Sequence, residues 1–263
     1  MTLSPGGGEY VLALADDEHM IGARHTSWIG LGPFLEEDLA FCSIAQDELG
    51  HAISLYELVL SDKVGIGIRD DFEARDVHLD RFALQRSPGE YRSCHLAERG
   101  CTDWNDSLVR HWLYDRAETI RWTALLDSSN EHLAAIATRA LSEESFHLEH
   151  AQQFMSRIAP ARPDPIIGSI TKLLPIALGI WDPVDGEPEA VADGVTTATS
   201  AELAEYWELA VRAELSDWGL DIDWPTGTST RDVQNHRRNR TAGFDGFQAD
   251  LCKVIDVDPA ARW

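Results

Sequence analysis

The sequence has 263 residues, of which 44% are hydrophobic, enough for a sizeable buried core. Asp and Glu outnumber Lys and Arg by 45 to 22, and the net charge of −23 argues against nucleic acid or an anionic membrane surface as a partner. There is no secretion signal, no run of about 20 apolar residues that predicts a membrane span and no Cys-x-x-Cys pair, so the expected location is the reducing cytoplasm.

Apolar positions recur at helical spacing and β-branched runs are scarce as far as Ile158, so the sequence predicts an all-α fold. The first helix stops at the Gly/Pro cluster of residues 30–33, where the second begins, and Asn130 is a suitable N-cap for the fourth. Two such hairpins joined by a long crossover are typical of a ferritin-like four-helix bundle. The expected helices are Glu9–Trp28, Phe34–Leu60, Thr102–Leu126 and Glu131–Ile158, with a shorter one, Asp70–Leu84, inside the crossover.

Beyond Pro160 the helical pattern weakens, and two more helices separated by a loop are expected. The loop is rich in Pro, Gly, Asp and Thr, and the second helix begins with Ser200 as its N-cap. We therefore expect residues 1–160 to form the bundle and residues 161–263 to form a helical extension that packs on it. The three expected segments are Pro165–Trp181, Asp182–Thr199 and Ser200–Trp218.

Each long helix has a stripe of residues, read at steps of three and four, that faces the bundle axis and is apolar except near its middle. There the second and fourth helices each carry a Glu-x-x-His unit, and the first and third each add one glutamate at the same level. This is the composition of a bundle site for two metal ions. The six predicted ligands are Glu18, Glu48, His51, Glu118, Glu144 and His147.

Four carboxylates in a bundle core would cost several kcal/mol each unless they were protonated or neutralised by cations. Two divalent ions balance four carboxylates. A ligand set rich in oxygen and poor in nitrogen favours iron, with manganese as the second choice, over zinc or copper. We therefore expect two Fe ions with dioxygen as a co-substrate, the alternative being a solvated face or a satisfied polar network.

Other polar residues lie close to this level. His25, His111 and Asp115 are candidates for orienting the ligand imidazoles, although burial with local hydrogen bonds is the simpler expectation. Glu37 lies about 16 Å along its helix from Glu48, at 1.5 Å per residue, so it is expected to form a structural ion pair instead. Three acidic residues fall off the stripes and are expected to be solvated: Asp47, Glu143 and Glu149.

Four short stretches carry a recognisable pattern: Leu35–Ala40, Ala45–His51, Asp106–Arg110 and Phe146–His150. In them the chain resembles the phenylacetate-catabolism family, within the ferritin-like superfamily, which contains the A and C subunits of phenylacetyl-CoA epoxidase. The residues in these stretches are more similar to those of the C subunit. The resemblance implies a di-iron catalyst if the chain acts as an A subunit does, and a structural role in a complex if it acts as a typical C subunit, which has lost metal ligands.

The leading functional prediction is a non-haem di-iron monooxygenase or oxidase that uses dioxygen to oxidise a small organic substrate. The alternative is a non-catalytic structural subunit of a multicomponent monooxygenase, which would not need the complete ligand set. Either function predicts a homo- or hetero-oligomer, with a homologous subunit or a reductase as partner. The substrate is expected to enter between the bundle and the extension, where the basic residues Arg231, Arg237, Arg238 and Arg240 are candidates to bind its carboxylate or phosphate.

Overall fold

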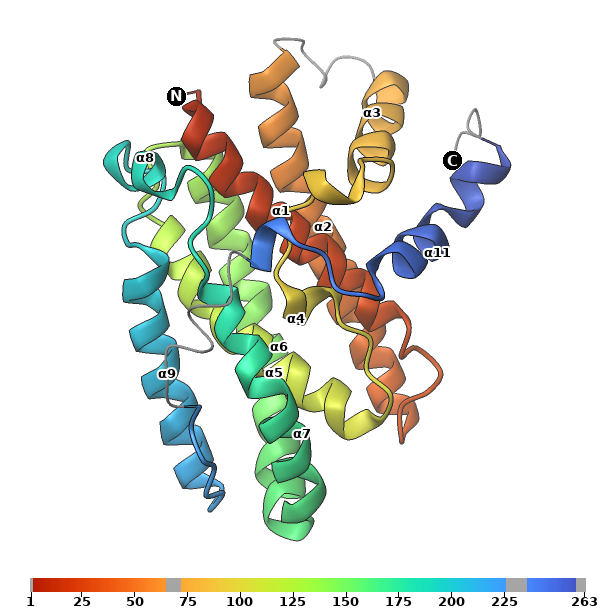
Figure 1. Ribbon diagram of the computed structural model, residues 1–263, viewed down its shortest axis with the longest axis vertical. Helices are drawn as coiled ribbons and strands as arrows, with labels where there is room; N and C mark the ends of the chain where they lie inside the picture. The colour runs from red at the N-terminus through yellow and green to blue at the C-terminus, as the bar shows by residue number, and fades with distance from the viewer. Residues whose placement is uncertain (1, 65–71, 226–235, 259–263) are drawn as a thin grey trace.

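The computed structural model describes residues 2–64, 72–225 and 236–258. Every regular element within these ranges is a helix, which confirms the predicted all-α fold (Figure 1). Four long helices form a ferritin-like bundle, in which α1 packs on α2 and α5 packs on α6 as two hairpins. The α2 and α6 helices also contact each other and so join the hairpins. Their bounds are α1 Pro5–Thr26, α2 Leu35–Val64, α5 Trp104–Leu125 and α6 Glu131–Ala161.

The crossover between the two hairpins holds three short elements. The first is close to the expected helix, whose first two residues, Asp70 and Asp71, lie outside the described residues. The other two were not predicted, because a turn of three or four residues leaves no helical period in the sequence. The elements are α3 (Phe72–Leu84), a 3₁₀ turn (Pro88–Glu90) and α4 (His95–Glu98).

Helix α1 begins at Pro5, four residues before the predicted start at Glu9. Ser4 caps it by accepting a hydrogen bond from the Gly7 N–H at 3.1 Å, and proline suits the first helical position. Gly6 lies so close to Glu189 that a Cβ at this position would overlap the carboxylate. The glycines that look like helix breakers in the sequence therefore belong to the helix, and one of them permits its contact with a later segment.

The predicted cap of α6 is confirmed: Asn130 Oδ1 accepts hydrogen bonds from the N–H groups of His132 and Leu133. The predicted cap of the late helix was wrong by one residue. Thr199 caps that helix, α9 (Ser200–Asp217), because its side chain and that of Glu202 each bond to the backbone N–H of the other. The Ser200 hydroxyl bonds to Glu187 instead.

The chain after α6 adds helices on several sides of the bundle. Helices α7 and α9 pack on α5, α8 packs on α1 and α11 packs on α3; α9 and α11 lie on opposite sides of the bundle (Figure 1). Helix α8 occupies part of the segment expected to be a loop. Helix α11 lies beyond Trp218, where no helix was predicted. The bounds are α7 Pro163–Ala177, a 3₁₀ turn Leu178–Trp181, α8 Glu187–Ala192, a 3₁₀ turn His236–Arg238 and α11 Phe244–Val257.

One hydrophobic core continues across the predicted boundary at residue 160. Trp112 and Leu113 of α5 belong to the same buried cluster as Leu173 of α7 and Trp207 of α9. The division into a bundle and an extension therefore stays a prediction. The segment Pro163–Trp181 is long and apolar enough to cross a membrane by composition, but half of it is buried inside the fold, as expected of a core helix.

Three of the four basic residues expected to bind substrate form ion pairs with carboxylates of the same chain. Arg237 is buried and donates to Asp17 of α1 at 3.0 Å, while Arg240 pairs with the buried Glu98 of α4. The exposed Arg238 pairs with Asp185 at 2.6 Å. Arg231 lies outside the described residues. The three described arginines thus neutralise carboxylates of the chain itself.

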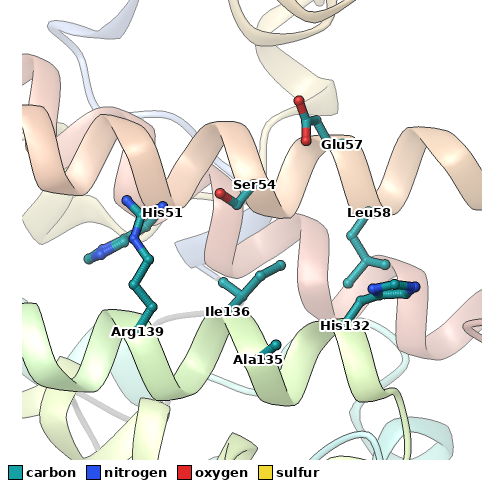
Figure 2. Close-up of a pocket in the computed structure, with 8 residues that line it drawn as sticks. All are labelled: His51, Ser54, Glu57, Leu58, His132, Ala135, Ile136 and Arg139. Carbon is teal, nitrogen blue, oxygen red and sulfur yellow. The ribbon is translucent and has the colours of Figure 1, made fainter. Parts of the chain in front are cut away.

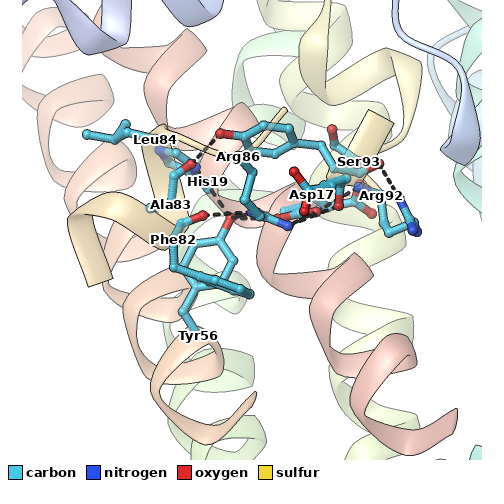
Figure 3. A network of polar contacts seen from close by, with 12 residues as sticks. Asp17, His19, Tyr56, Phe82, Ala83, Leu84, Arg86, Arg92 and Ser93 are labelled. Carbon is cyan, nitrogen blue, oxygen red and sulfur yellow. Dashed lines mark hydrogen bonds and ion pairs between the residues drawn. The ribbon is translucent and has the colours of Figure 1, made fainter. Parts of the chain in front are cut away.

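A second polar network beside Asp17 ties the crossover to α1 and α2 (Figure 3). Arg86 pairs with Asp16 and donates to the Tyr56 hydroxyl at 3.2 Å. The Tyr56 hydroxyl donates to the same Asp16 carboxylate at 2.7 Å, and the backbone N–H of Arg92 does so as well. These contacts hold α1 in place directly beside the residues that face the bundle axis.

Candidate metal centre

Four of the six predicted ligands meet in the middle of the bundle. Glu18 comes from α1, Glu48 and His51 from α2, and Glu144 from α6; each is almost completely buried. One potential ligand atom from each side chain lies within 4.8 Å of those from the other three. The helical spacing of three residues in each Glu-x-x-His unit places these side chains on one face, as the sequence predicted.

Both predicted histidines face this cluster with the same ring atom. His51 Nδ1 lies 3.0 Å from Glu18 and 3.6 Å from Glu144, while His147 Nδ1 lies 3.3 Å from Glu144. The other ring nitrogen of each histidine contacts an acidic residue: His51 Nε2 lies 2.7 Å from Glu143, and His147 Nε2 lies 3.2 Å from Asp47.

Each of these two histidines is contacted by a carboxylate from the opposite helix. Asp47 of α2 bonds to His147 of α6, and Glu143 of α6 bonds to His51 of α2. Metal-binding histidines commonly donate their second N–H to a carboxylate, which fixes the ring and turns the free lone pair towards the ion. Asp47 and Glu143 are partly exposed, at 34% and 29%, so they are solvated in part as expected, but the contact between α2 and α6 also brings each of them onto the opposite histidine, which the sequence did not predict.

The cluster is short of hydrogen bonds. Within the described part of the chain, the carboxylate oxygens of Glu48 and Glu144 and His147 Nδ1 meet no partner in good hydrogen-bond geometry: Glu48 lies against Glu18, and Glu144 and His147 contact each other. Burial raises the pKa of Glu48 well above its usual range, and the neighbouring Glu144 and Glu18 raise it further. Buried acceptors that face one another in this way are satisfied by protons or by a cation, so the donor set fits a metal ion.

Glu118 of α5 is buried but is held differently. Its Oε1 accepts a hydrogen bond from Arg121, one turn further along the helix, and Arg121 also bonds to Asp17. Arg121 thus provides positive charge at the place where the sequence predicts a ligand. Only one oxygen of Glu118 takes part in this pair, so the pair does not decide whether Glu118 binds a metal ion. Its role as a ligand stays a prediction.

A pocket of 310 Å³ reaches the cluster from outside, between α2 and α6 (Figure 2). His51 and Arg139 lie at one end of the pocket, and Leu58 and His132 lie at the other, with Ile136 between them. Arg139 also pairs with Glu143 at 3.1 Å. This route differs from the expected entrance between the bundle and the later helices, because here the two helices that carry the Glu-x-x-His units form the walls.

The family model described as phenylacetic acid catabolic protein matches residues 6–263. The chain belongs to this family. It is 24% identical, over 265 aligned residues, to the C subunit of 1,2-phenylacetyl-CoA epoxidase from Escherichia coli (strain K12). The alignment covers 97% of this chain and 98% of that relative, so the later helices belong to the match as well as the bundle.

In this phenylacetic acid catabolic protein, a row of polar side chains runs from the start of α2 towards the cluster. Glu37 lies 3.1 Å from His150, His150 lies 3.3 Å from His111, and His111 lies 2.8 Å from Asp115. Burial lowers the pKa of both His111 and His150 to about 3, so both rings are neutral. Glu37 is therefore hydrogen-bonded to a neutral imidazole and does not form the predicted ion pair. His111 Nδ1 and Asp115 lie 2.8 Å apart without hydrogen-bond geometry, and the ligand imidazoles contact Asp47 and Glu143 instead.

Glu37 should make stability depend on pH. Burial, followed by the charges of Glu36 and Asp38, raises its pKa from 4.5 to about 7. The native state then holds a proton that the unfolded state releases, so this contribution to stability is complete below pH 4.5 and lost as the pH rises through about 7. Thermal melts with a chelator present should show the loss in the parent protein and a smaller loss in Glu37→Gln. The control is Glu149→Gln on the exposed face of α6, and identical pH profiles for parent and Glu37→Gln would contradict the prediction.

Proposed function

We propose that this chain is a non-haem di-iron oxygenase subunit that uses dioxygen to oxidise a small organic substrate. The observation that carries the proposal is the paired arrangement of His51 and His147. Each ring is held at Nε2 by a carboxylate from the opposite helix, and each turns Nδ1 towards the buried carboxylates of the cluster: His51 towards Glu18 and Glu144, and His147 towards Glu144. Family membership supports an oxygenase-related role, since a relative over the whole chain is an epoxidase subunit.

The residues proposed to hold the two iron ions are Glu18, Glu48, His51, Glu118, Glu144 and His147. Iron suits this set of four carboxylates and two imidazoles better than zinc or copper, and manganese is the second choice. Bound there, iron would supply the electrons and the open positions that dioxygen chemistry requires. For Glu118 to serve as a ligand, its second oxygen must bind the ion while Arg121 keeps the first.

The protein itself supplies orientation and a dry site. Asp47 and Glu143 fix the two imidazoles, and the Tyr114 hydroxyl donates to Glu18 at 3.3 Å. Trp122 packs edge-on against His51, with ring centroids 5.6 Å apart, and excludes water from that side. The oxidised part of the substrate would occupy the pocket beside His51, where Leu58 and Ile136 offer apolar contact and Arg139 a charge for an acidic group.

We also propose that the chain works with a homologous subunit and a reductase, since its relative is one subunit of an epoxidase. Several large apolar side chains at the start of α2 and in the turn before it are exposed, as at surfaces that meet another protein. They are Leu31, Phe34, Leu35 and Leu39. The pairing of Glu118 with Arg121 is an argument for the alternative, a structural subunit. The metal content of the purified protein decides between an oxygenase and a structural subunit.

Anaerobic reconstitution with ferrous iron is expected to give two irons per chain, followed by oxygen uptake that depends on substrate. One iron per chain would mean that Arg121 keeps Glu118 from the metal, and the six-ligand assignment would then be wrong. Two irons without oxygen uptake in the presence of the partner subunit and reductase would support the structural role. A metal content near zero with intact helicity would contradict the metal centre altogether.

A further inference from the structure

A second pocket, of 210 Å³, lies away from the candidate metal centre, where the end of α1 approaches the start of α5. Two arginines line it: Arg24 from the last turn of α1 and Arg110 from α5. Trp28 and Leu31 form an apolar side of the pocket, and Ser27 and Thr102 line it as well. The pocket is therefore cationic on one side and apolar on another.

Arg110 is completely buried and only partly satisfied. One terminal nitrogen donates to the backbone oxygen of Arg99 at 2.6 Å. Within residues 2–64, 72–225 and 236–258, its Nε and its other terminal nitrogen have no hydrogen-bond partner. A buried guanidinium with two unused donors costs free energy unless a ligand accepts from them.

Arg24 is fixed beside it through other atoms. Its Nε donates to the backbone oxygen of Glu98 at 2.7 Å, and its guanidinium lies over the Phe247 ring, 3.5 Å from the centroid. Burial and the charge of Arg110 lower the pKa of Arg24 to about 10, so it remains charged at neutral pH. The two positive charges repel each other across the pocket.

Neither arginine has a carboxylate partner in the described part of the chain, which distinguishes them from the other buried arginines. Arg121, Arg237 and Arg240 each form an ion pair with a buried carboxylate. Of the carboxylates whose charges act on the two arginines, Glu98 is paired with Arg240, Asp106 with Lys172 and Asp250 with Lys253, and burial raises the pKa of the fourth, Asp115, well above its usual range. In a chain with 45 acidic residues, two unpaired arginines at one pocket indicate that the missing anion comes from outside.

We propose that Arg24 and Arg110 bind a phosphate group in this pocket. A phosphate carries close to two negative charges at neutral pH, which matches two guanidinium groups, and its oxygens accept bidentate hydrogen bonds from arginine. The hydroxyls of Ser27 and Thr102 are further donors, and Trp28 and Leu31 can contact an organic group attached to the phosphate. The ligand class is a phosphate monoester, with free phosphate as its smallest member. This proposal does not depend on the proposed oxygenase function.

Calorimetric titration of the full-length protein with inorganic phosphate at constant ionic strength is expected to show one saturable site per chain. The melting temperature should rise with phosphate and stay unchanged with an equal ionic strength of chloride. Phenyl phosphate distinguishes the two sources of the group: tighter binding than inorganic phosphate identifies a monoester site, and equal binding identifies a site for free phosphate. Absence of saturable binding for both compounds at millimolar concentration would overturn the proposal.

Two variants and a matched control link the binding to the pocket. Arg110→Met is expected to weaken phosphate binding by at least about tenfold, since a charge-assisted hydrogen bond is worth more than 1.4 kcal/mol. Without phosphate its melting temperature should equal or exceed that of the parent, because an unpaired buried charge is removed. Should this variant fail to fold, the partly exposed Arg24→Gln is expected to show the same loss of binding. Arg238→Gln, on the exposed surface, should bind as the parent does; equal weakening in this control would show that phosphate binds by general charge and would overturn the assignment.

Discussion

Replacing Arg237 by methionine is expected to lower the free energy of unfolding by about 3–5 kcal/mol, the usual effect of removing one partner from a buried ion pair. Arg237 donates to both oxygens of Asp17 and also to the backbone oxygens of Arg92 and Ile180. The substitution removes a donor from the backbone oxygens of Arg92 and Ile180, and it leaves Asp17 with Arg121 as its remaining guanidinium partner and with the backbone N–H of Cys94. Chemical denaturation monitored by circular dichroism measures the change.

The matched control is Arg238→Met, one residue further along the chain. Its guanidinium is exposed and pairs with the partly exposed Asp185, so little change in stability is expected. If the two variants lose the same stability, the C-terminal arginines contribute general charge and Arg237 does not hold the fold. A chain truncated after Gly219 would lack Arg237 as well, so it should also be less stable than the full-length protein.

Replacing Glu48 by methionine is expected to have opposite effects on the metal-free and the iron-loaded protein. The Glu48 carboxylate is completely buried against Glu18 and Glu144, which together with burial raise its pKa well above its usual range, so its removal should stabilise the metal-free protein by about 1–3 kcal/mol. The same change should reduce iron binding from two ions per chain to one or none. Iron analysis and thermal melts with and without iron measure the two effects on the same samples.

Glu143→Gln is the informative comparison for Glu48→Met. In the parent protein the Glu143 carboxylate orients His51 without belonging to the central cluster. Its loss should therefore leave two irons per chain at saturation and lower the affinity for iron about 10- to 100-fold. Iron binding by Glu48→Met that equals the parent's would contradict the predicted ligand set. Destabilisation of the metal-free Glu48→Met protein would show that the carboxylate is satisfied in solution.

The helical periodicity carries most of what the sequence could predict about the site. A stripe read at steps of three and four residues places Glu18, Glu48, His51 and Glu144 together, because these residues lie on inward faces of straight helices. Asp47 and Glu143 lie beside those stripes, and their contacts depend on how closely α2 and α6 approach each other. A signal for them exists in the sequence, since an acidic residue precedes both Glu-x-x-His units.

The remaining differences come from contacts that no local pattern contains. The pairing of Glu118 with Arg121 follows from helical spacing, but the bond from Arg121 to Asp17 on another helix does not. Helix α8 has six residues and is held by packing on α1, where Gly6 permits the approach of Glu189. Thr199 was missed as a cap because either of two neighbouring hydroxyl residues can start a helix, and the choice depends on which one pairs with Glu202.

The contact between Asp17 and Arg237 also bears on the order in which the protein is completed during synthesis. The two residues are 220 positions apart, so at about 5–20 residues per second the ribosome adds Arg237 some 10 to 40 s after Asp17. Until then Asp17 lacks the second of its two guanidinium partners, although the two hairpins of the bundle have already been translated. The entropy of closing so long a loop grows only slowly with its length, so the delay is set by translation. We therefore expect nascent chains to keep α1 more accessible to chaperones and proteases until Arg237 has been made.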